Sequence, residues 1–355
     1  MIRSLKITTV AGIGLYLHWT LLAVAAFLLA PALLSFRENP LALGQVFFFG
    51  AIFSCVALHE LGHALAARRY GVGTRRITLL PIGGIAELER LPESPKAELW
   101  IALSGPLVNL VIGICLFAGG VISVGIEKFL LYDSWFGGFV RDLTLANLAM
   151  VVFNLIPALP MDGGRVLRAI LAMTMPARRA TRFAATVGRT LAVAFVIVGL
   201  FVLSQPILAF IGAFVFIAAG AEEKFAELRH RLAGHTVREV VQHQFSVFPA
   251  DTPIPHAFAH MLVSPQRTFP VVEDGRCVGL ISRQDLERLG PDGSGKTQVS
   301  DVMQACETLS PDDGLHEVAV RMSGDQATWP VSDRGQLVGI VTRESLAIFL
   351  RSSAA

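Results

Sequence analysis

The stretch VALHELGHALAARRYGV, residues 56–72, contains the pattern that decides the fold of this chain. His59 and His63 are four residues apart, and Glu60 follows the first of them. On a helix of about 3.6 residues per turn the two imidazoles share one face, where their nitrogens can reach a single zinc ion at roughly 2.0–2.1 Å. Glu60 points beside that axis and can take a proton from a water without ligating the metal. The pattern predicts the catalytic helix of a zinc hydrolase.

The residues before this pattern are apolar, and so is most of the chain. Of 355 residues, 53% are hydrophobic and only 16% are charged, and the mean hydropathy is +0.57. Such a composition excludes an ordinary soluble protein. Segments apolar enough to cross a bilayer occur at about 17–36, 44–67, 98–124, 140–160, 187–203 and 206–221. We therefore predict a polytopic α-helical membrane domain of about six spans over residues 1–221, in which a charged triplet inside a span marks a functional site.

The basic residues sort by loop, which predicts the orientation of the chain. With the N-terminus taken as cytoplasmic, the loops on that side contain thirteen Lys and Arg residues: Arg3, Lys6, Arg68, Arg69, Arg75, Arg76, Arg90, Lys96, Arg165, Arg168, Arg178, Arg179 and Arg182. The opposite loops contain three: Arg37, Lys128 and Arg141. By the positive-inside rule we expect a multi-pass protein of the cell membrane with both termini in the cytoplasm. A net charge of +2 without a basic patch gives no reason to expect a nucleic-acid partner.

Two histidines leave a zinc site one protein ligand short. The segment FNLIPALPMDGGRVL, residues 153–167, supplies Asp162 where two prolines and a glycine pair interrupt the fourth predicted span. A helix broken at membrane depth leaves backbone groups unpaired unless they line a watered cavity, so the break suggests that water reaches this point. Asn154 lies on nearly the same helical face as Asp162, and its amide can hydrogen-bond the oxyanion formed on a peptide carbonyl. Glu87 is the nearest alternative carboxylate.

These residues carry a resemblance to a known family. The positions that match are His59-Glu60-Leu61-Gly62-His63, LHWTLL at 17–22, SGPLVNL at 104–110, and Asn154, Pro157 and Asp162-Gly163. Together they resemble the site-2 protease family of intramembrane zinc metalloproteases. The resemblance implies a three-span catalytic core, one zinc per chain held by His59, His63 and Asp162, and Glu60 as general base. It also implies a membrane-spanning protein substrate, cut near the cytoplasmic face, and a polar channel that admits water.

The segment ITLLPIGGIAELERLPESP, residues 77–95, is apolar but interrupted by Pro81 and by Gly83-Gly84. It is a poor helix, and a two-stranded re-entrant hairpin fits it better. A helical substrate hides its carbonyls in its own hydrogen bonds, so an edge strand of such a hairpin could hold the unwound substrate by β-augmentation. The alternative is an ordinary cytoplasmic loop.

The tail of the chain is soluble in composition and repeats itself. A charged, helix-prone linker at 222–235 follows the last span, and FPVVEDGRCVGLISRQDL (269–286) then aligns without a gap on WPVSDRGQLVGIVTRESL (329–346). Two units of about 60 residues, at 236–290 and 297–351, resemble a tandem CBS domain, or Bateman module, with an α/β fold. Such modules often pair, which leaves a homodimer through the tail open. The four cysteines contain no CxxC pair, and we expect no disulfide.

The two repeats differ at the start of their last helices. Ser282 aligns with Thr342, but Asp285 aligns with Ser345. In CBS domains that bind adenosine nucleotides, a hydroxyl at this position meets phosphate and an acid three residues later holds the ribose. The resemblance thus implies one nucleotide site, through Ser282 and Asp285, at a helix start that favours an anion. A capping box that only closes the helix explains the same two residues.

Two other classes of protein remain to be weighed against an intramembrane protease. A CBS-regulated membrane transporter is the alternative function, but it gives no reason for a glutamate between two histidines with a matching Asp162. A membrane-anchored protease with its catalytic helix outside the bilayer would need a polar domain around His59, yet residues 47–58 read FFFGAIFSCVAL.

Overall fold

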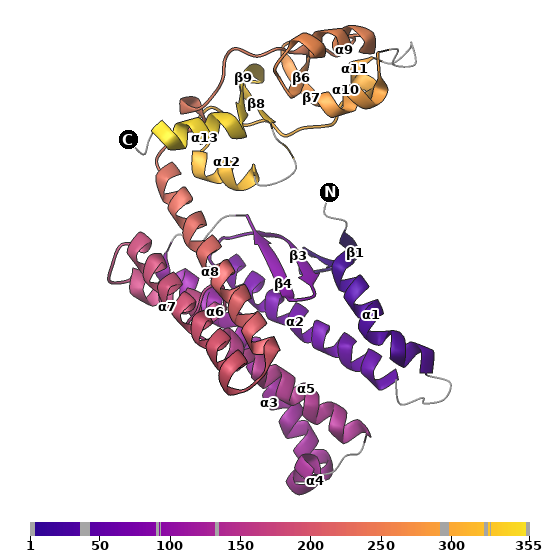
Figure 1. Ribbon diagram of the computed structural model, residues 1–355, viewed down its shortest axis with the longest axis vertical. Coiled ribbons are helices and arrows are strands. Elements are labelled where there is room, and N and C mark those ends of the chain that lie inside the picture. The colour runs from indigo at the N-terminus through magenta and orange to yellow at the C-terminus, as the bar shows by residue number, and fades with distance from the viewer. Residues whose placement is uncertain are drawn as a thin grey trace. The chain divides into compact units, whose positions relative to one another are not determined.

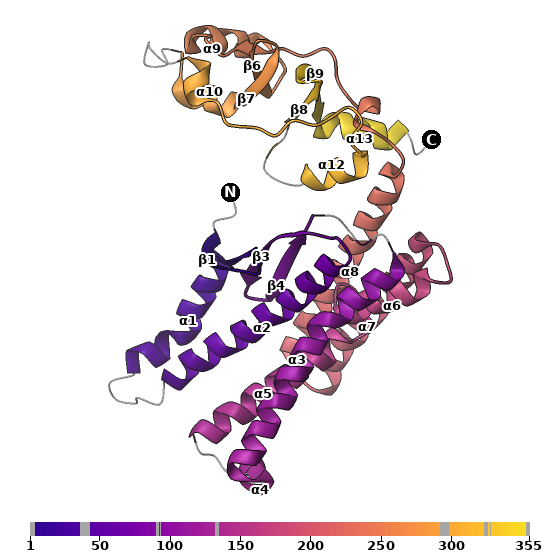
Figure 2. The same cartoon turned by 180° about the vertical axis from the view of Figure 1, so that it is seen from behind.

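The computed structural model describes residues 4–35, 43–89, 92, 94–131, 135–291, 298–322, 326 and 328–352. The chain divides into two compact units, Met1–Ala226 and Glu227–Ala355. The first is largely helical and the second mixes short helices and strands (Figures 1 and 2). This confirms the expected order of a helical domain followed by an α/β module. Of the basic residues used for orientation, Arg3, Arg37 and Arg90 lie outside the described residues.

Eight helices form the framework of the first unit within the described residues. They are α1 (Trp19–Ser35), α2 (Leu43–Arg69), α3 (Pro95–Val124), α4 (Ile126–Leu131), α5 (Trp135–Asn154), α6 (Asp162–Ala172), α7 (Ala177–Ile197, continued by the π-helical turn Val198–Val202) and α8 (Pro206–Leu232). Helix α3 packs against α2, α5 and α6. This central position brings residues from distant parts of the sequence to one place.

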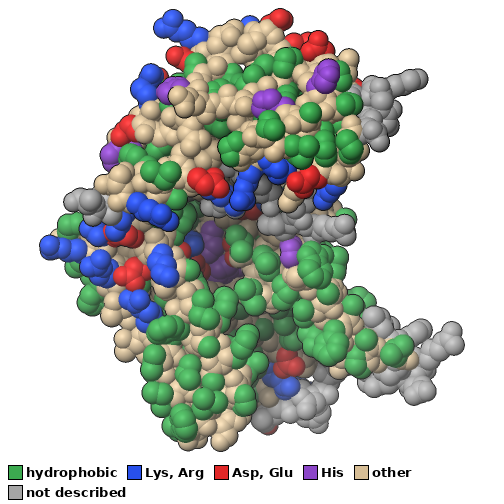
Figure 3. Space-filling view, turned by 45° about the horizontal axis from the view of Figure 1, so that its top comes forward, with side chains coloured by type: hydrophobic (Ala, Val, Ile, Leu, Met, Phe, Trp, Pro, Cys, Tyr) green, Lys and Arg blue, Asp and Glu red, His purple; other side chains and the backbone are tan. Residues whose placement is uncertain are grey.

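Within the described residues, four helical segments are long and apolar enough to cross a membrane. They are Gly44–Arg69, Pro95–Val124, Ala177–Val202 and Pro206–Leu232. Helix α1 has 17 residues, and the 20 residues of α5 include Arg141 and Asp142; both match predicted spans in position but are not among the four. Hydrophobic side chains cover much of the visible face of this unit (Figure 3), as a lipid-facing surface requires. The number of six spans stays a prediction.

A four-stranded sheet lies beside α2. Its strands are β1 (Ser4–Val10), β2 (Ile13–His18), β3 (Thr74–Leu80) and β4 (Gly83–Leu88), in that order. Strands β3 and β4 are antiparallel, which confirms the hairpin predicted from residues 77–95. Strands β1 and β2 were not predicted, and β2 joins β3 in parallel. Ile13, Ile77 and Leu79 are buried together with Ala64 of α2, so the sheet rests on the helix that carries the histidines.

Helix α8 runs past the predicted boundary at residue 221. It continues to Leu232, so most of the predicted linker is helical. The chain departs from the helix just before Gly234, whose φ of +84° is a conformation that glycine adopts without steric cost. Between Gly220 and Leu232 the sequence contains no proline or further glycine that would end α8 earlier.

The second unit contains two structural repeats. The first comprises a 3₁₀ turn (Val237–Glu239), β5 (Phe248–Pro249), α9 (Ile254–Val263), β6 (Thr268–Glu273), β7 (Arg276–Ser282) and α10 (Arg283–Leu289). The second comprises α11 (Val299–Val302), α12 (Leu315–Arg321), β8 (Thr328–Asp333), β9 (Gln336–Thr342) and α13 (Arg343–Ser352). Each repeat forms a backbone β-bridge to a strand of the other. Gln242 of the first repeat pairs with Ile340 on β9, and Gln304 of the second pairs with Leu280 on β7. Each repeat thus completes the other, as the pseudo-twofold prediction requires.

Candidate metal centre

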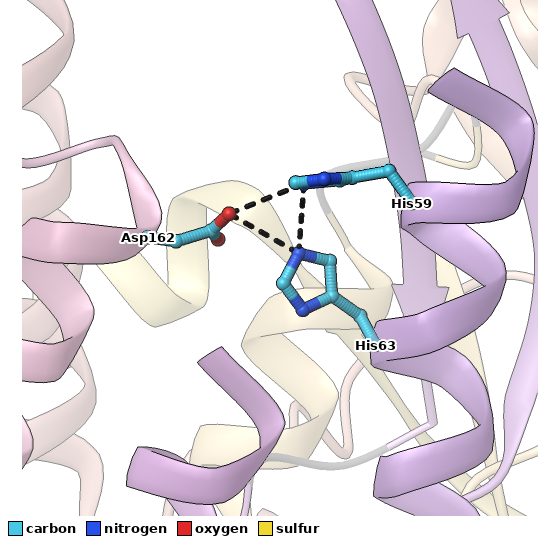
Figure 4. A group of neighbouring side chains, drawn as sticks. All are labelled: His59, His63 and Asp162. Carbon is cyan, nitrogen blue, oxygen red and sulfur yellow. Dashed lines mark hydrogen bonds and ion pairs between the residues drawn. The ribbon is translucent and has the colours of Figure 1, made fainter. Parts of the chain in front are cut away.

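Three side chains from two distant segments converge in the first unit. His59 and His63 lie one turn apart on α2, and Asp162 is the first residue of α6 (Figure 4). His59 and Asp162 are buried, with 6% and 8% of their surface exposed. All three were predicted as metal ligands from the sequence. Among the described residues, they form the one group of His, Cys, Asp or Glu side chains that could hold a metal ion.

The donor atoms of this group have the spacing that zinc requires. Oδ2 of Asp162 is 3.2 Å from Nε2 of His59 and 3.2 Å from Nε2 of His63. The two Nε2 atoms are also 3.2 Å apart. Ligands about 2.0–2.1 Å from a tetrahedral zinc are separated by about 3.3 Å, so these three atoms fit three corners of such a tetrahedron. Two nitrogens and a carboxylate oxygen are also the donor set of many catalytic zinc sites, which keep the fourth corner free.

A hydrogen bond from one of the histidines to the backbone of α3 orients its ring. Nδ1 of His63 lies 2.7 Å from the carbonyl oxygen of Ile101. Since a carbonyl only accepts, the proton of the neutral ring is on Nδ1 and the lone pair of Nε2 is directed at the donor group. The sequence does not show this contact, because it joins two helices 38 residues apart.

The interruption between α5 and α6 places Asp162. Helix α5 ends at Asn154, and a tight turn with a cis Leu159–Pro160 bond leads directly into α6. A Cβ on Gly163 would lie 2.3 Å from the carbonyl oxygen of Ile156, so only glycine lets α6 begin against this turn. The predicted break is therefore present. Asn154 is half-buried at the end of α5, and its role at the oxyanion stays a prediction.

Glycine at position 105 lets α3 approach the histidine pair. A Cβ there would lie 2.3 Å from Nε2 of His63 and 2.7 Å from Nε2 of His59. Gly62, between the two histidines, likewise approaches the carbonyl oxygen of Ser104, which a Cβ would meet at 2.9 Å. The resemblance marks SGPLVNL only as a matching segment, so this role of Gly105 is not predicted from the sequence. A small residue in a long apolar helix was the available signal.

Gly105→Ala is expected to lower zinc affinity by about 10–100-fold, because the added methyl group occupies the space of the ligating nitrogens. Gly119→Ala is the matched control on the same helix, since a Cβ at Gly119 meets nothing within 4 Å. Zinc titration of both purified variants in detergent measures the difference. Equal affinities would show that α3 does not constrain the ligands.

Strand β4 passes directly over the candidate general base. A Cβ on Gly84 would lie 2.3 Å from Cγ and 3.0 Å from Oε1 of Glu60. The side chain of Glu60 thus lies against the last strand of the sheet. The alternative carboxylate, Glu87, is instead engaged by Arg76, with 2.8 Å between Nη2 and Oε1.

An ion-pair network ties α6 to its neighbours. Arg168, six residues after Asp162, donates from Nε to Oε1 of Glu98 on α3 over 2.6 Å. Its Nη1 is also 3.6 Å from Oε1 of Glu222 on α8. Arg168 and Glu98 are largely buried, so the pair is less screened than a surface ion pair. The helix that carries the third ligand is held at both α3 and α8.

In the second unit, Ser282 and Asp285 form a capping box at the start of α10. Oγ of Ser282 donates to Oδ2 of Asp285 over 2.5 Å, and the backbone N–H of Asp285 donates back to Oγ. Nε2 of Gln304 lies 3.5 Å from the same carboxylate oxygen. The capping alternative therefore describes the contacts present, and nucleotide binding by these residues stays a prediction.

Comparisons with known proteins agree with this division of the chain. The family model of peptidase family M50 matches residues 47–139 and 132–198, and that of the CBS domain matches residues 237–291 and 299–352. A zinc metalloprotease of Methanocaldococcus jannaschii is 32% identical over 345 residues, which cover 97% of this chain and 95% of the relative.

Two further similarities cover smaller shares of the chain. The stage IV sporulation protein FB of Bacillus subtilis is 30% identical over 176 residues, which cover 49% of this chain and 57% of that protein. The solved structure of the site-2 protease from Methanocaldococcus jannaschii is 35% identical and covers 62% of this chain and 95% of its own, with a TM-score of 0.45.

Proposed function

The chain belongs to peptidase family M50, the zinc metalloproteases of the site-2 protease type, and on this premise we propose that it hydrolyses peptide bonds within or near transmembrane segments of membrane proteins. One observation carries the proposal. The buried triangle of His59, His63 and Asp162 is built on α2, a helix apolar enough to cross a membrane. A transporter would not need this donor set, and the relative that spans nearly the whole chain is a zinc metalloprotease.

The residues around the metal centre divide the work of peptide hydrolysis. His59, His63 and Asp162 would hold one zinc, which would act as a Lewis acid on the water and on the scissile carbonyl. Glu60 takes the proton from the attacking water and returns it to the leaving amine. Asn154 donates its amide N–H to the oxyanion that develops on the carbonyl oxygen.

Strand β4 is suited to present the substrate. It is the last strand of the sheet, so one edge has no partner among the described strands, and its Gly84 lies against Glu60. A transmembrane helix must unwind before its carbonyls can be attacked, and an extended segment can then add to this edge through backbone hydrogen bonds. Because such pairing uses only backbone groups of the substrate, it does not require a particular substrate sequence. In this proposal the edge of β4 sets the distance between the scissile bond and the base.

Comparative proteomics of membranes tests the proposal. Cells that produce the active protein are compared with cells that produce Glu60→Gln. Some membrane proteins are expected to be cut, and to release their soluble part, only in the cells with the active protein. The cleavage sites should map within or next to apolar segments. Cuts confined to soluble loops would contradict intramembrane proteolysis.

We further propose that both termini are cytoplasmic, since basic residues gather at the ends of the predicted spans on that side. Reporter enzymes fused to the C-terminus check this orientation. A reporter that is active only in the cytoplasm is expected to be active in this fusion. Activity of a reporter that requires export would reverse the topology.

For the tail we propose regulation by an adenosine nucleotide at Ser282 and Asp285. Calorimetry of the full chain with AMP, ADP and ATP is expected to show one site, which Asp285→Ala removes and Ser345→Ala, at the aligned position, does not. Binding must favour one arrangement of the tail to alter activity. Unchanged binding by Asp285→Ala would leave the pair as a helix cap, and absence of binding would remove this regulation.

A further inference from the structure

Two thiols, one from each repeat of the second unit, lie close together where the repeats pair through Leu280 and Gln304; we call this pairing a seam. Sγ of Cys277 on β7 is 3.7 Å from Sγ of Cys306, which follows α11, and both residues are half-buried and free. A disulfide has an S–S distance of about 2.05 Å, so closing the bond needs a movement of less than about 2 Å. Neither residue belongs to the metal centre or to the predicted nucleotide site.

Backbone pairing between the repeats holds the two thiols in register. The N–H of Leu280 donates to the carbonyl of Gln304 over 2.9 Å, and the N–H of Gln304 donates back over 2.8 Å. Cys306 lies two residues beyond this pair in one direction and Cys277 three residues before it in the other, so the antiparallel arrangement brings their side chains together. The closeness of the two residues is therefore a result of the backbone pairing.

The pseudo-equivalent seam has the same backbone contacts but no thiols. There Gln242 and Ile340 exchange backbone hydrogen bonds of 2.9 and 3.1 Å. The residues aligned with Cys277 and Cys306 are Leu337 and Gln244. Since the same pairing forms without cysteine, the fold does not require sulfur at this position, and the placement of both cysteines at one seam calls for a chemical role.

The environment makes the two thiols unequal. Donation from the Cys306 S–H lowers the pKa of Cys277, which also contacts the carbonyl oxygen of Gly279 at 3.4 Å. The pKa of Cys306 is raised by the same contact and by burial. A thiolate is the nucleophile in thiol chemistry, so Cys277 is the attacking group and Cys306 the resolving group.

The sequence predicts no disulfide and the four cysteines are free in the structure, but we propose that Cys277 and Cys306 form a reversible disulfide between the two CBS repeats when the protein meets an oxidised low-molecular-weight thiol. The Cys277 thiolate attacks the small disulfide, forms a mixed disulfide and releases one small thiolate, which takes up the proton lost from Cys277. The Cys306 thiol then loses its proton and attacks Sγ of Cys277, and the second small thiol leaves with that proton. Two protein thiols are oxidised and one small disulfide is reduced to two thiols.

The link would close the seam through which the repeats exchange hydrogen bonds. Its loop from Cys277 to Cys306 encloses α10, and Gln304, which contacts Asp285, lies two residues from Cys306. In the oxidised tail, β7 could no longer move away from the segment around Cys306. The arrangement of the module would thus respond to the redox state of its compartment.

Thiol mapping of the full chain in detergent tests the proposal. The protein carries Cys115→Ser, which removes an exposed thiol in α3, and is incubated with glutathione disulfide, alkylated and analysed by peptide mass mapping. We expect one intramolecular link between Cys277 and Cys306, reversed by dithiothreitol, while Cys55 stays reduced. Cys277 and Cys306 that remain fully alkylatable, or that both keep stable glutathione adducts, would overturn the proposal.

Single variants test the roles of the two thiols and do not depend on the stability of the link. Cys306→Ser keeps a hydrogen-bond donor beside Cys277 and is expected to accumulate a glutathione adduct on Cys277. With both cysteines present, the glutathione adduct trapped at short times should lie on Cys277. Faster reaction at Cys306 would overturn the assigned order of attack. Circular dichroism of each variant confirms that the module is folded.

Discussion

Glu60→Gln is expected to keep its zinc and to lose peptide cleavage by about 10²–10⁴-fold. Glutamine has nearly the shape of glutamate but cannot take a proton from water, and His59, His63 and Asp162 remain to bind the metal. Metal analysis and a gel-based cleavage assay in detergent measure the two effects on one preparation. Glu127→Gln, an exposed position in α4, is the control and should retain both zinc and activity.

Two outcomes would differ from the result expected for Glu60→Gln. Substantial proteolysis by Glu60→Gln would show that another group accepts the proton. Loss of zinc together with activity would show that Glu60 supports the ligands, although its Cγ lies beside Gly84 on the strand side of the helix. The first result removes the general-base role, and the second makes the loss of activity uninformative about proton transfer.

Asp162→Ala is expected to lose both zinc and activity. The carboxylate oxygen supplies one of three donors at 3.2 Å spacing, and two histidines alone hold zinc much more weakly. Zinc content after dialysis against a weak chelator should fall by at least about tenfold, the lower bound for loss of a group that supports a metal site.

Asp142→Ala provides the matched control, because Asp142 is exposed near the other end of α5 and pairs with Arg141. It should keep wild-type zinc content and activity. Equal zinc in wild type and Asp162→Ala would exclude Asp162 as a ligand and return attention to other carboxylates. Glu87 is then a weaker candidate than the sequence suggested, since Arg76 already engages it.

The three residues of the candidate metal centre could be proposed from the sequence because each part has a local signal. Two histidines four apart define one face of a helix, and a proline- and glycine-rich interruption marks where a later span must leave its axis. Asp162 stands at that interruption, and its buried position beside the histidines agrees with the prediction. Burial and mutual contact are what the structure adds.

The supporting contacts could not be predicted because they depend on helix packing. Nothing local indicates that the carbonyl of Ile101 receives a hydrogen bond from His63, or that Gly105 faces the ligating nitrogens. Both contacts follow from the crossing of α2 and α3, which a single sequence does not specify. The same holds for Cys277 and Cys306, whose proximity results from pairing between two repeats.

The sheet shows where local patterns mislead. Residues 83–88 follow a proline and form the predicted hairpin with 74–80, but β2 pairs with β3 across more than fifty residues of sequence. The first predicted span begins at residue 17, at the end of β2, and no strand is predicted for the short run before it. Strand pairing over such a separation leaves no periodic signal in either strand.

X-ray absorption spectroscopy of the zinc-loaded full chain tests most directly whether His59, His63 and Asp162 hold the metal. The predicted first coordination shell contains only nitrogen and oxygen, at about 2.0–2.2 Å. Sulfur at about 2.3 Å would contradict the account, because it would assign the metal to cysteines such as Cys277 and Cys306 and leave the buried triangle without its proposed ion.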